Sequence, residues 1–232
     1  MQLFYFKNAS EDGLELDKEQ TRHITKVLRK RQGDRISVTN GQGKLFDATL
    51  GQVTSNKVLV DLAFAKAEPK PYPPLHIAIA PTKLNDRFEF FLEKACEIGV
   101  QTITPILTSN SERKKINHSR FEKILISAMQ QSNQLWLPDL KSLTSFNSLI
   151  TESGEVVKVI AHCEEEKRSF IGDVLGKNYP SLVLIGPEGD FTKQEIEQAL
   201  QSDFTPVTLG NTRLRTETAG IYAAAIYSSS CR

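Results

Sequence analysis

The sequence predicts an α/β fold that combines a small, mostly β-stranded N-terminal domain with a larger C-terminal domain built on a parallel sheet. Before residue 67 most apolar residues alternate as in β-strands, whereas after residue 74 short apolar runs alternate with segments of helical spacing. Strands that alternate with helices form a mainly parallel sheet covered on both faces. Four prolines within residues 69–74 favour an extended connector, so we expect domains at residues 1–70 and 71–232.

The N-terminal segment has the pattern of a small β-barrel interrupted by one helix. Apolar alternation predicts strands at residues 2–6, 35–39, 44–53 and 57–64. Turn signals follow at Asn40-Gly41 and Ser55-Asn56. Asp17 is a suitable N-cap for a helix that extends to about Arg29. The side chains expected to face inward from this helix are Ile24, Val27 and Leu28.

The C-terminal segment alternates between strands and helices along its whole length. The apolar runs predict strands at residues 75–80, 102–107, 156–161, 181–185 and 205–209. Helical spacing predicts helices at residues 86–98, 119–132, 145–152, 192–201 and 217–228. Gly99 is a stop signal for the first of these helices, and Thr192 with Glu195 forms the capping-box pattern that starts the fourth.

The composition excludes several classes of protein. A net charge of +1 argues against a globally basic nucleic-acid binder, so any affinity for nucleic acid must come from local patches. The three cysteines, Cys96, Cys163 and Cys231, are widely spaced and favour reduced thiols over a disulfide framework or a metal site. No apolar run approaches the roughly 18 residues that suggest a membrane span. We therefore expect a cytoplasmic protein without a metal.

Two glycine-containing loops each follow a buried strand, at residues 184–192 and 209–220. Loops at the carboxyl ends of parallel strands are where α/β domains bind ligands, so the two loops predict one composite pocket for a nucleotide-like ligand. Glu188 and Asp190 make the first loop acidic, and neither a GxxxxGK nor a GxGxxG motif is present. The ligand should therefore carry positive charge or ribose hydroxyls rather than a polyphosphate. A plain tight turn is the alternative for this loop.

The second loop concentrates charge just before a helix. Arg213, Arg215 and Glu217 lie close together, and arginines are unfavourable near the positive end of a helix dipole. Their presence indicates an anionic partner, or an ion pair between an arginine and Glu217. The following helix is rich in small residues, which is compatible with burial or with a subunit interface. The turn at residues 162–166, His-Cys-Glu-Glu-Glu, follows a strand and could reach the pocket, but it is interpreted as a solvent-facing acidic turn.

Four motifs give the chain a specific resemblance to a known family. They are His23-Ile-Thr-Lys-Val-Leu-Arg29 with Gly33-Asp34, Lys94-Ala-Cys-Glu-Ile-Gly-Val100, Ile185-Gly-Pro-Glu-Gly189 and Leu214-Arg-Thr-Glu-Thr-Ala219. In this order and in this two-domain arrangement they resemble the RsmE family of ribosomal RNA methyltransferases, which are members of the SPOUT class. The resemblance implies a PUA-like N-terminal domain, a C-terminal trefoil knot and a homodimer.

The resemblance also implies an activity and a site. It implies transfer of a methyl group from S-adenosylmethionine to ring N3 of one uridine in 16S ribosomal RNA of the small ribosomal subunit. Cofactor-binding residues are expected in the two loops, namely Leu184, Ile185, Gly186, Pro187, Glu188, Gly189, Leu209, Gly210, Asn211, Arg213 and Leu214. We expect Arg215 to stabilise the uracil oxyanion and Glu217 or Glu188 to accept the proton, unless positioning alone suffices.

Binding of RNA is expected mainly from a basic stretch in the N-terminal domain. Residues 22–35 contain six Lys or Arg and one acidic residue. The expected RNA contacts are Arg22, His23, Lys26, Arg29, Lys30, Arg31 and, in the second domain, Lys83. A solvated helix face is the alternative interpretation of this stretch.

Three positions depart from the family pattern. They are Asn211-Thr-Arg213 in place of Pro-Arg-Ile, Gln134 in place of an arginine, and Asp190 in place of a second glycine. Two other functions stay open from the sequence: a non-catalytic RNA-binding or ribosome-assembly protein, and a SPOUT methyltransferase with a different RNA target atom.

Overall fold

The computed structural model describes residues 2–10, 13–16, 18–27, 29–53, 58–164, 168–175 and 179–230. The predicted cap Asp17, the inward-facing Leu28, the Ser55-Asn56 turn, Glu165, Glu166 and Cys231 lie outside these residues. Contacts divide the chain into two compact units, one of Met1–Lys70 with Met129–Leu137 and one of Pro71–Ala128 with Pro138–Arg232. Each unit is described by itself.

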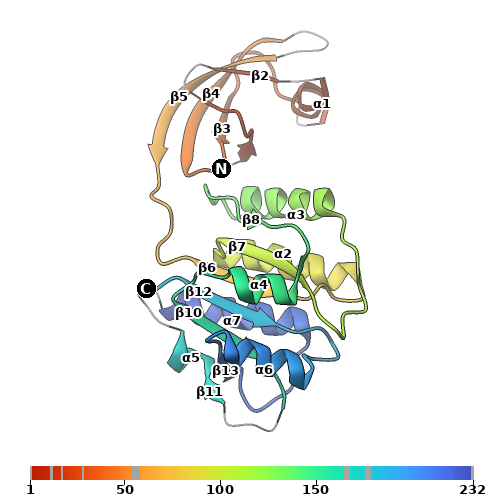
Figure 1. Ribbon diagram of the computed structural model, residues 1–232. Coiled ribbons are helices and arrows are strands. Elements are labelled where there is room, and N and C mark those ends of the chain that lie inside the picture. The colour runs from red at the N-terminus through yellow and green to blue at the C-terminus, as the bar shows by residue number, and fades with distance from the viewer. Residues whose placement is uncertain are drawn as a thin grey trace. The chain divides into compact units, whose positions relative to one another are not determined.

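The first unit is built on a curled five-stranded sheet (Figure 1). Its strands are β1 (Leu3–Tyr5), β2 (Leu14–Leu16), β3 (Arg35–Thr39), β4 (Lys44–Val53) and β5 (Val58–Ala67), in the order β1-β3-β4-β5-β2. The pair β1 and β3 is parallel, and the other neighbours are antiparallel. The four predicted strands are confirmed. The sequence did not predict β2, because three residues are too few to show an alternation.

The predicted helix at residues 17–29 has a different form in the structure. A short α-helix, α1 (Lys18–Arg22), continues as a π-helical segment, η1 (His23–Val27). Ile24 is buried in the core of this unit, as predicted. The prediction for Val27 is wrong, because its side chain is 63% exposed. A π-helix has more residues per turn than the 3.6 that the pattern assumed, so its later residues rotate away from the core.

The segment Met129–Leu137 packs within the first unit, although it begins with the last residues of the helix His118–Gln131, whose other residues belong to the second unit. The Trp136 indole donates to the Glu68 carbonyl at 3.2 Å, and the Leu137 amide donates to the Gly41 carbonyl at 2.9 Å. Gly43 has a φ of 84°, and a Cβ there would lie 2.6 Å from the Trp136 ring. This contact therefore requires glycine at position 43.

The second unit contains a parallel sheet in the order β11-β13-β10-β12-β6-β7-β8, with β9 paired to β7. Its strands are β6 (Leu75–Ile79), β7 (Thr102–Leu107), β8 (Asp139–Leu140), β9 (Thr144–Ser145), β10 (Val157–Ala161), β11 (Ser169–Phe170), β12 (Ser181–Ile185) and β13 (Thr205–Thr208). Ala161, Ile185 and Ile79 are register partners across the three central strands. The carboxyl ends of these strands therefore share one edge of the sheet.

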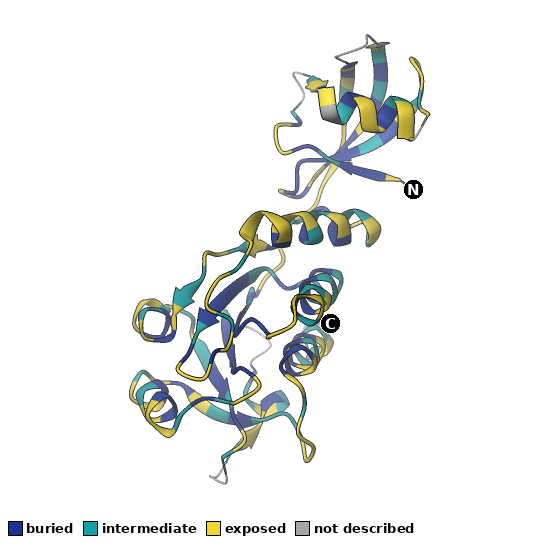
Figure 2. Ribbon diagram, turned by 90° about the vertical axis from the view of Figure 1, so that its right-hand side faces the viewer, coloured by how far each residue is buried: buried dark blue, intermediate teal, exposed yellow. Residues whose placement is uncertain are grey.

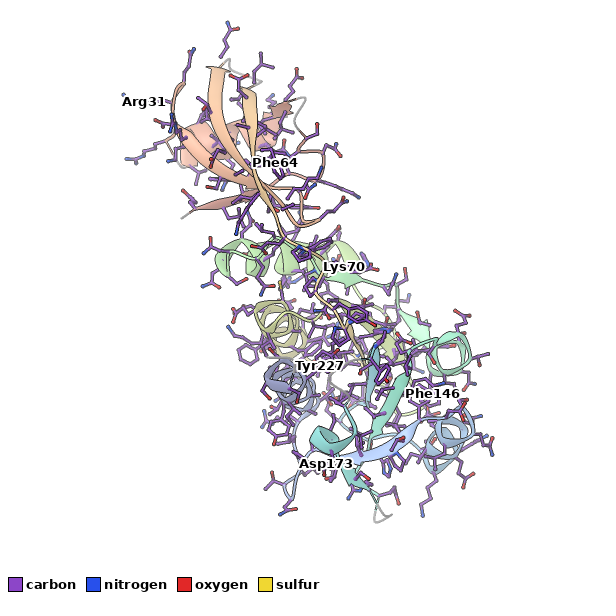
Figure 3. All side chains as sticks on the ribbon, turned by 90° about the vertical axis from the view of Figure 1, so that its left-hand side faces the viewer. Arg31, Phe64, Lys70, Phe146, Asp173 and Tyr227 are labelled. Carbon is purple, nitrogen blue, oxygen red and sulfur yellow. The ribbon has the colours of Figure 1, made fainter. Side chains whose placement is uncertain are left out.

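Helices cover both faces of this sheet (Figure 1). They are α2 (Asn85–Ile98), α3 (His118–Gln131), α4 (Phe146–Glu152), α5 (Ile171–Val174), α6 (Lys193–Gln201) and α7 (Thr216–Ser230). On one face α4 and α6 pack through Phe146, Ile150 and Ile196 in a cluster with the strands. On the other face α7 packs against α2, β6 and β12. Figure 2 shows the strands of this sheet largely buried and the outer sides of the helices exposed, and Figure 3 shows Phe146 and Tyr227 on opposite faces.

The predicted strands and helices of this unit are confirmed. Gly99 ends α2 with a φ of 97°, and Thr192 and Glu195 form the predicted capping box at the start of α6. The elements that the sequence did not predict, β8, β9, β11 and α5, have at most four residues each. After β13, which lies between the edge strand β11 and β10, the chain returns to the middle of the sheet as α7. This segment lies in the C-terminal region where the resemblance implies a trefoil knot. Among the described residues, no helix is long and apolar enough to cross a membrane.

A partly buried ion pair lies near the amino-terminal end of β6. His76 Nδ1 is 2.6 Å from Glu155 Oε1, and its Nε2 is 2.7 Å from Thr104 Oγ1. Burial raises the pKa of the Glu155 carboxyl, whereas the hydrogen bond and charge of His76 lower it. The lowering effects together are larger, so the pKa lies below its ordinary value of 4.5. A carboxyl whose pKa is lower in the folded than in the unfolded protein stabilises the fold at pH values above its unfolded-state pKa. This contribution disappears as the pH falls through the folded-state pKa.

We expect Glu155→Gln to reduce stability most at neutral pH. The difference in unfolding free energy between wild type and variant should shrink as the pH is lowered from about 6 to about 3, because the lost contribution requires an ionised carboxylate. Urea denaturation at a series of pH values measures this difference. A difference that stays constant over the range would contradict the assignment.

Candidate active site

A cavity of about 300 Å³ lies at the carboxyl edge of the sheet in the second unit. Its walls come from the ends of β10, β12 and β13, from the loops that follow them and from the first turns of α7. The lining residues are Ala161, His162, Cys163, Ile185, Gly186, Pro187, Glu188, Asp190, Val207, Leu209, Thr212, Arg213, Leu214, Arg215, Thr216 and Ala219. Both glycine-containing loops therefore contribute to one cavity.

The loop after β12 is a tight turn tied to the start of α7. The Asp190 amide donates to the Pro187 carbonyl at 2.9 Å, which closes the turn. The Thr216 hydroxyl, which is buried, donates to the Gly186 carbonyl at 3.1 Å. A Cβ at Gly186 would lie 3.1 Å from the Phe191 ring, so a larger residue would disturb the turn. These contacts hold the first loop against the helix that follows the second loop.

The loop after β13 carries the two arginines at the mouth of the cavity. Gly210 has a φ of 128°, a conformation that residues other than glycine rarely adopt. Arg213 and Arg215 are both exposed, and the Arg213 guanidinium lies 3.5 Å from the Glu188 carbonyl oxygen. Exposed guanidinium groups at the rim have donors that can bind an anionic or polarised group.

Most residues predicted to bind a cofactor lie at this cavity. Of the eleven predicted positions, the structure places Ile185, Gly186, Pro187, Glu188, Leu209, Arg213 and Leu214 in the lining. Leu184, Gly189, Gly210 and Asn211 belong to the same loops but not to the lining among the described residues. Leu184 is instead fully buried in the sheet's core.

The three predicted catalytic residues have different surroundings. Arg215 and Glu188 line the cavity and are exposed, whereas Glu217 is buried and lies outside the lining. Glu217 Oε1 is 4.0 Å from Arg87 Nε of α2, and Glu217 Oε2 has no hydrogen-bond partner among the described residues. Among these residues the cation next to Glu217 is therefore Arg87, and the alternative of an ion pair with Arg213 or Arg215 is wrong.

For the turn after β10 the sequence favoured a solvent-facing position over contact with the pocket. His162 is buried and lines the cavity together with Cys163, so the interpretation of this turn as solvent-facing is wrong for His162. The signal was the position of the turn after a buried strand, but only the pairing of β10 with β12 shows that it reaches this cavity. Glu165 and Glu166 of the same turn lie outside the described residues.

Lys83, predicted to contact RNA, lies near Glu188. Its main-chain amide donates to Glu188 Oε1 at 3.1 Å. Its side chain is exposed and pairs with Glu112 at 2.8 Å, and this hydrogen bond and charge raise the pKa of the lysine. Arg113 donates to the carbonyl oxygens of Thr82 and Lys83 and so fixes this loop.

The predicted RNA contacts of the first unit form an exposed basic segment on α1, η1 and the turn that follows. Arg22, His23, Lys26, Arg29 and Arg31 are exposed, and Lys30 is partly buried. The Arg31 side chain extends outward in Figure 3, while its amide donates to Asp34 Oδ2 at 2.8 Å. The turn thus presents Arg31 to solvent.

The other His, Cys, Asp and Glu side chains that the structure describes are candidates for a metal site. Among the described residues, no group of three or more His, Cys, Asp or Glu side chains could hold a metal ion. Burial, with a smaller contribution from Glu97, raises the pKa of the Cys96 thiol to about 12. Cys96 therefore stays protonated at neutral pH.

Comparisons with known proteins identify the family. Residues 68–228 match an RNA methyltransferase domain, and residues 16–63 match an RNA methyltransferase PUA domain. Ribosomal RNA small subunit methyltransferase E of Buchnera aphidicola is 31% identical, with 92% of this chain and 88% of the relative covered.

Solved structures of similar proteins match this chain over nearly its whole length, which includes both domains. A chain from Porphyromonas gingivalis is 37% identical with a TM-score of 0.87, and 97% of this chain and 95% of that chain are covered. Ribosomal RNA small subunit methyltransferase E from Neisseria gonorrhoeae, solved bound to S-adenosyl methionine, is 26% identical with a TM-score of 0.83 over 97% of this chain and 95% of its own. The chain therefore belongs to the RsmE family of RNA methyltransferases, with a PUA-like first domain and a SPOUT-type second domain.

Proposed function

We propose that the protein transfers a methyl group from S-adenosylmethionine to ring N3 of one uridine in 16S ribosomal RNA. The convergence of the two glycine-containing loops on one cavity is the observation that carries this proposal. Family membership supports it, as does the bound S-adenosyl methionine in the Neisseria gonorrhoeae relative.

The residues of the cavity fit this donor. Apolar side chains of Val207, Leu209 and Leu214 offer a surface for an adenine ring, and the carboxylate of Glu188 favours a cation. A volume of about 300 Å³ lies at the lower end of the range for small-molecule sites. When bound, the donor supplies an electrophilic methyl group on a positively charged sulfonium. We assign its binding to residues 184–189, 209–211, 213 and 214.

The chain's own residues then prepare the acceptor. Loss of the N3 proton places negative charge on the uracil carbonyl oxygens, and Arg215 at the rim supplies the positive charge that stabilises it. Glu188 also lines the cavity and is the better placed proton acceptor, whereas Glu217 lies deeper beside Arg87. Glu217 would have to act after a change in its surroundings. Positioning of the reactants supplies the remainder of the rate enhancement.

We further propose a division of labour between domains 1–70 and 71–232. The first binds RNA through Arg22, His23, Lys26, Arg29, Lys30 and Arg31, and Lys83 adds a contact in the second. Deleting residues 1–70 would also remove the groups against which Trp136 packs. Point substitutions are therefore the cleaner test of this division.

We expect RNA affinity to fall when Arg22, Lys26 and Arg31 are replaced by glutamine. Each lost phosphate contact lowers the magnitude of the slope of log affinity against log salt by roughly 0.7–0.9, so the loss of three contacts should lower it by about two to three. Fluorescence anisotropy with 16S RNA fragments at several salt concentrations measures both effects. A control variant carries glutamine at Lys66, Lys70 and Lys123. An equal loss in the control, or none in the test variant, would contradict the assignment.

The surroundings of the reaction follow from the same proposal. A 16S acceptor places the enzyme in the cytoplasm and makes the small ribosomal subunit its partner. We also propose a homodimer, as the resemblance to the RsmE family implies. The small residues Ala219, Gly220, Ala223 and Ala224 of α7 are buried within the second unit and do not form its interface. Sedimentation velocity distinguishes a dimer from a monomer.

Calorimetric titration with S-adenosylmethionine tests the donor assignment. We expect saturable binding of the donor and no binding of ATP at the same concentration, because the acidic loop lacks a phosphate cradle. Binding of ATP in preference to the donor, or of neither ligand, would refute the assignment.

A further inference from the structure

Asp190 has an unusual backbone conformation at the edge of the cavity. Its φ is 62°, in the left-handed region where side chains other than those of Asn and Asp are rare. The residue also lines the cavity. A glycine would adopt this conformation without strain, so the side chain of Asp190 must be explained by its contacts.

Both carboxylate oxygens of Asp190 accept hydrogen bonds from the main chain. Oδ1 accepts from the Phe191 amide at 2.8 Å, within its own loop. Oδ2 accepts from the Cys163 amide at 2.7 Å, in the turn after β10. These contacts join two loops that both line the cavity. The link is strong, because hydrogen bonds to an ionised carboxylate are short and strong.

Residues 189 and 190 of the loop after β12 also form hydrogen bonds with a third loop. The Asn110 side-chain amide, in the loop after β7, donates to the carbonyl oxygens of Gly189 and Asp190 at 3.1 and 3.0 Å. The loop after β12 is thus held from both sides. The contact between Asp190 and Cys163 joins two residues that both line the cavity.

The charge of Asp190 also acts on the Cys163 thiol. Burial is the largest cause that raises the pKa of this thiol, and the charge and hydrogen bond of Asp190 raise it further. Cys163 is exposed, so a reagent can reach its sulfur. Its alkylation rate therefore reports on the contact independently of any bound ligand.

We propose that Asp190 is a positioning residue that fixes the turn of His162 and Cys163 as one wall of the donor cavity. The proposal rests on the proposed function, in that the ligand of the cavity is S-adenosylmethionine. Asp190 holds the wall in place before the ligand arrives, so the ligand does not have to order it. Its effect is therefore on donor affinity rather than on the methyl transfer step.

The test compares Asp190→Gly and Asp190→Asn with Asp203→Gly. Glycine keeps the backbone conformation and removes both hydrogen bonds, whereas asparagine keeps one acceptor oxygen. Asp203 is a matched control, because it is exposed, has a φ of 66° and lies outside the cavity. We expect Asp190→Gly to raise the KM for S-adenosylmethionine about tenfold with kcat nearly unchanged. Asp190→Asn should fall between Asp190→Gly and wild type, and Asp203→Gly should match wild type.

Alkylation of Cys163 by iodoacetamide, followed by peptide mass mapping without any donor, provides the second readout. Both Asp190 variants should react faster than wild type, because loss of the charge lowers the pKa of the thiol. Buried Cys96 serves as an unreactive reference that reports unfolding. An unchanged KM in Asp190→Gly, or an unchanged alkylation rate in both variants, overturns the proposal. If wild type fails to bind the donor while the alkylation rates change as expected, the proposed function fails and the contact of Asp190 stands.

Discussion

Arg215→Ala should lower the rate of methyl transfer at saturating RNA and donor by about 10² to 10³, the usual effect of removing one group that stabilises an oxyanion. Arg215 lines the cavity from its exposed rim, so its removal leaves the buried walls unchanged. Donor affinity should therefore change by less than about threefold. Single-turnover assays with labelled donor measure the rate, and calorimetry measures the affinity.

Arg120→Ala is the matched control for this prediction. Arg120 lies on α3 and forms an exposed ion pair with Glu89 at 2.6 Å, which contributes little to stability. Its removal should leave the transfer rate near that of wild type. Full activity of Arg215→Ala would refute the role of Arg215, and equal losses in both variants would show that the effect is not specific to the cavity.

Gly220→Val should destabilise the second unit by about 3 kcal/mol, because it overpacks a filled core. A Cβ at Gly220 would lie 2.6 and 2.8 Å from atoms of the Phe91 ring and 2.9 Å from Ile79 Cδ1. Phe91 and Ile79 are fully buried, so neither side chain can swing into solvent. Thermal unfolding should shift downward by roughly 6–12 °C, at about 2–4 °C per kcal/mol for a chain of this size.

Gly154→Val provides the comparison for Gly220. A Cβ at Gly154 meets no atom within 4 Å, and the glycine is exposed. Its substitution should change stability by no more than about 0.5 kcal/mol. If Gly220→Val unfolded at the same temperature as wild type, the close packing of α7 on α2 would be wrong.

The sequence was most informative where a pattern is local. Gly99 and the capping box of Thr192 and Glu195 mark helix ends through bonds within a few residues, and the structure has both. The buried strands of the second unit were visible as apolar runs. The convergence of the two loops followed from their place after parallel strands.

Features that depend on distant residues were not predictable. Arg87 is 130 residues before Glu217, and the turn of His162 reaches the cavity only because β10 pairs with β12. The π-helical turn that exposes Val27 departs from the spacing on which helix prediction depends. Asp190 was visible as a departure from the family pattern, but its contact with Cys163 needed the structure.

The identity of the methylated atom distinguishes the proposed reaction from its alternatives. Small ribosomal subunits from a strain that lacks this protein should be incubated with the purified protein and methyl-labelled S-adenosylmethionine, and the 16S RNA mapped by mass spectrometry. We expect one added methyl group per RNA, on ring N3 of a single uridine, and none with Arg215→Ala at the same reaction time. A methyl group on a ribose or another base, or no methyl group with the wild-type protein, would refute the proposed function.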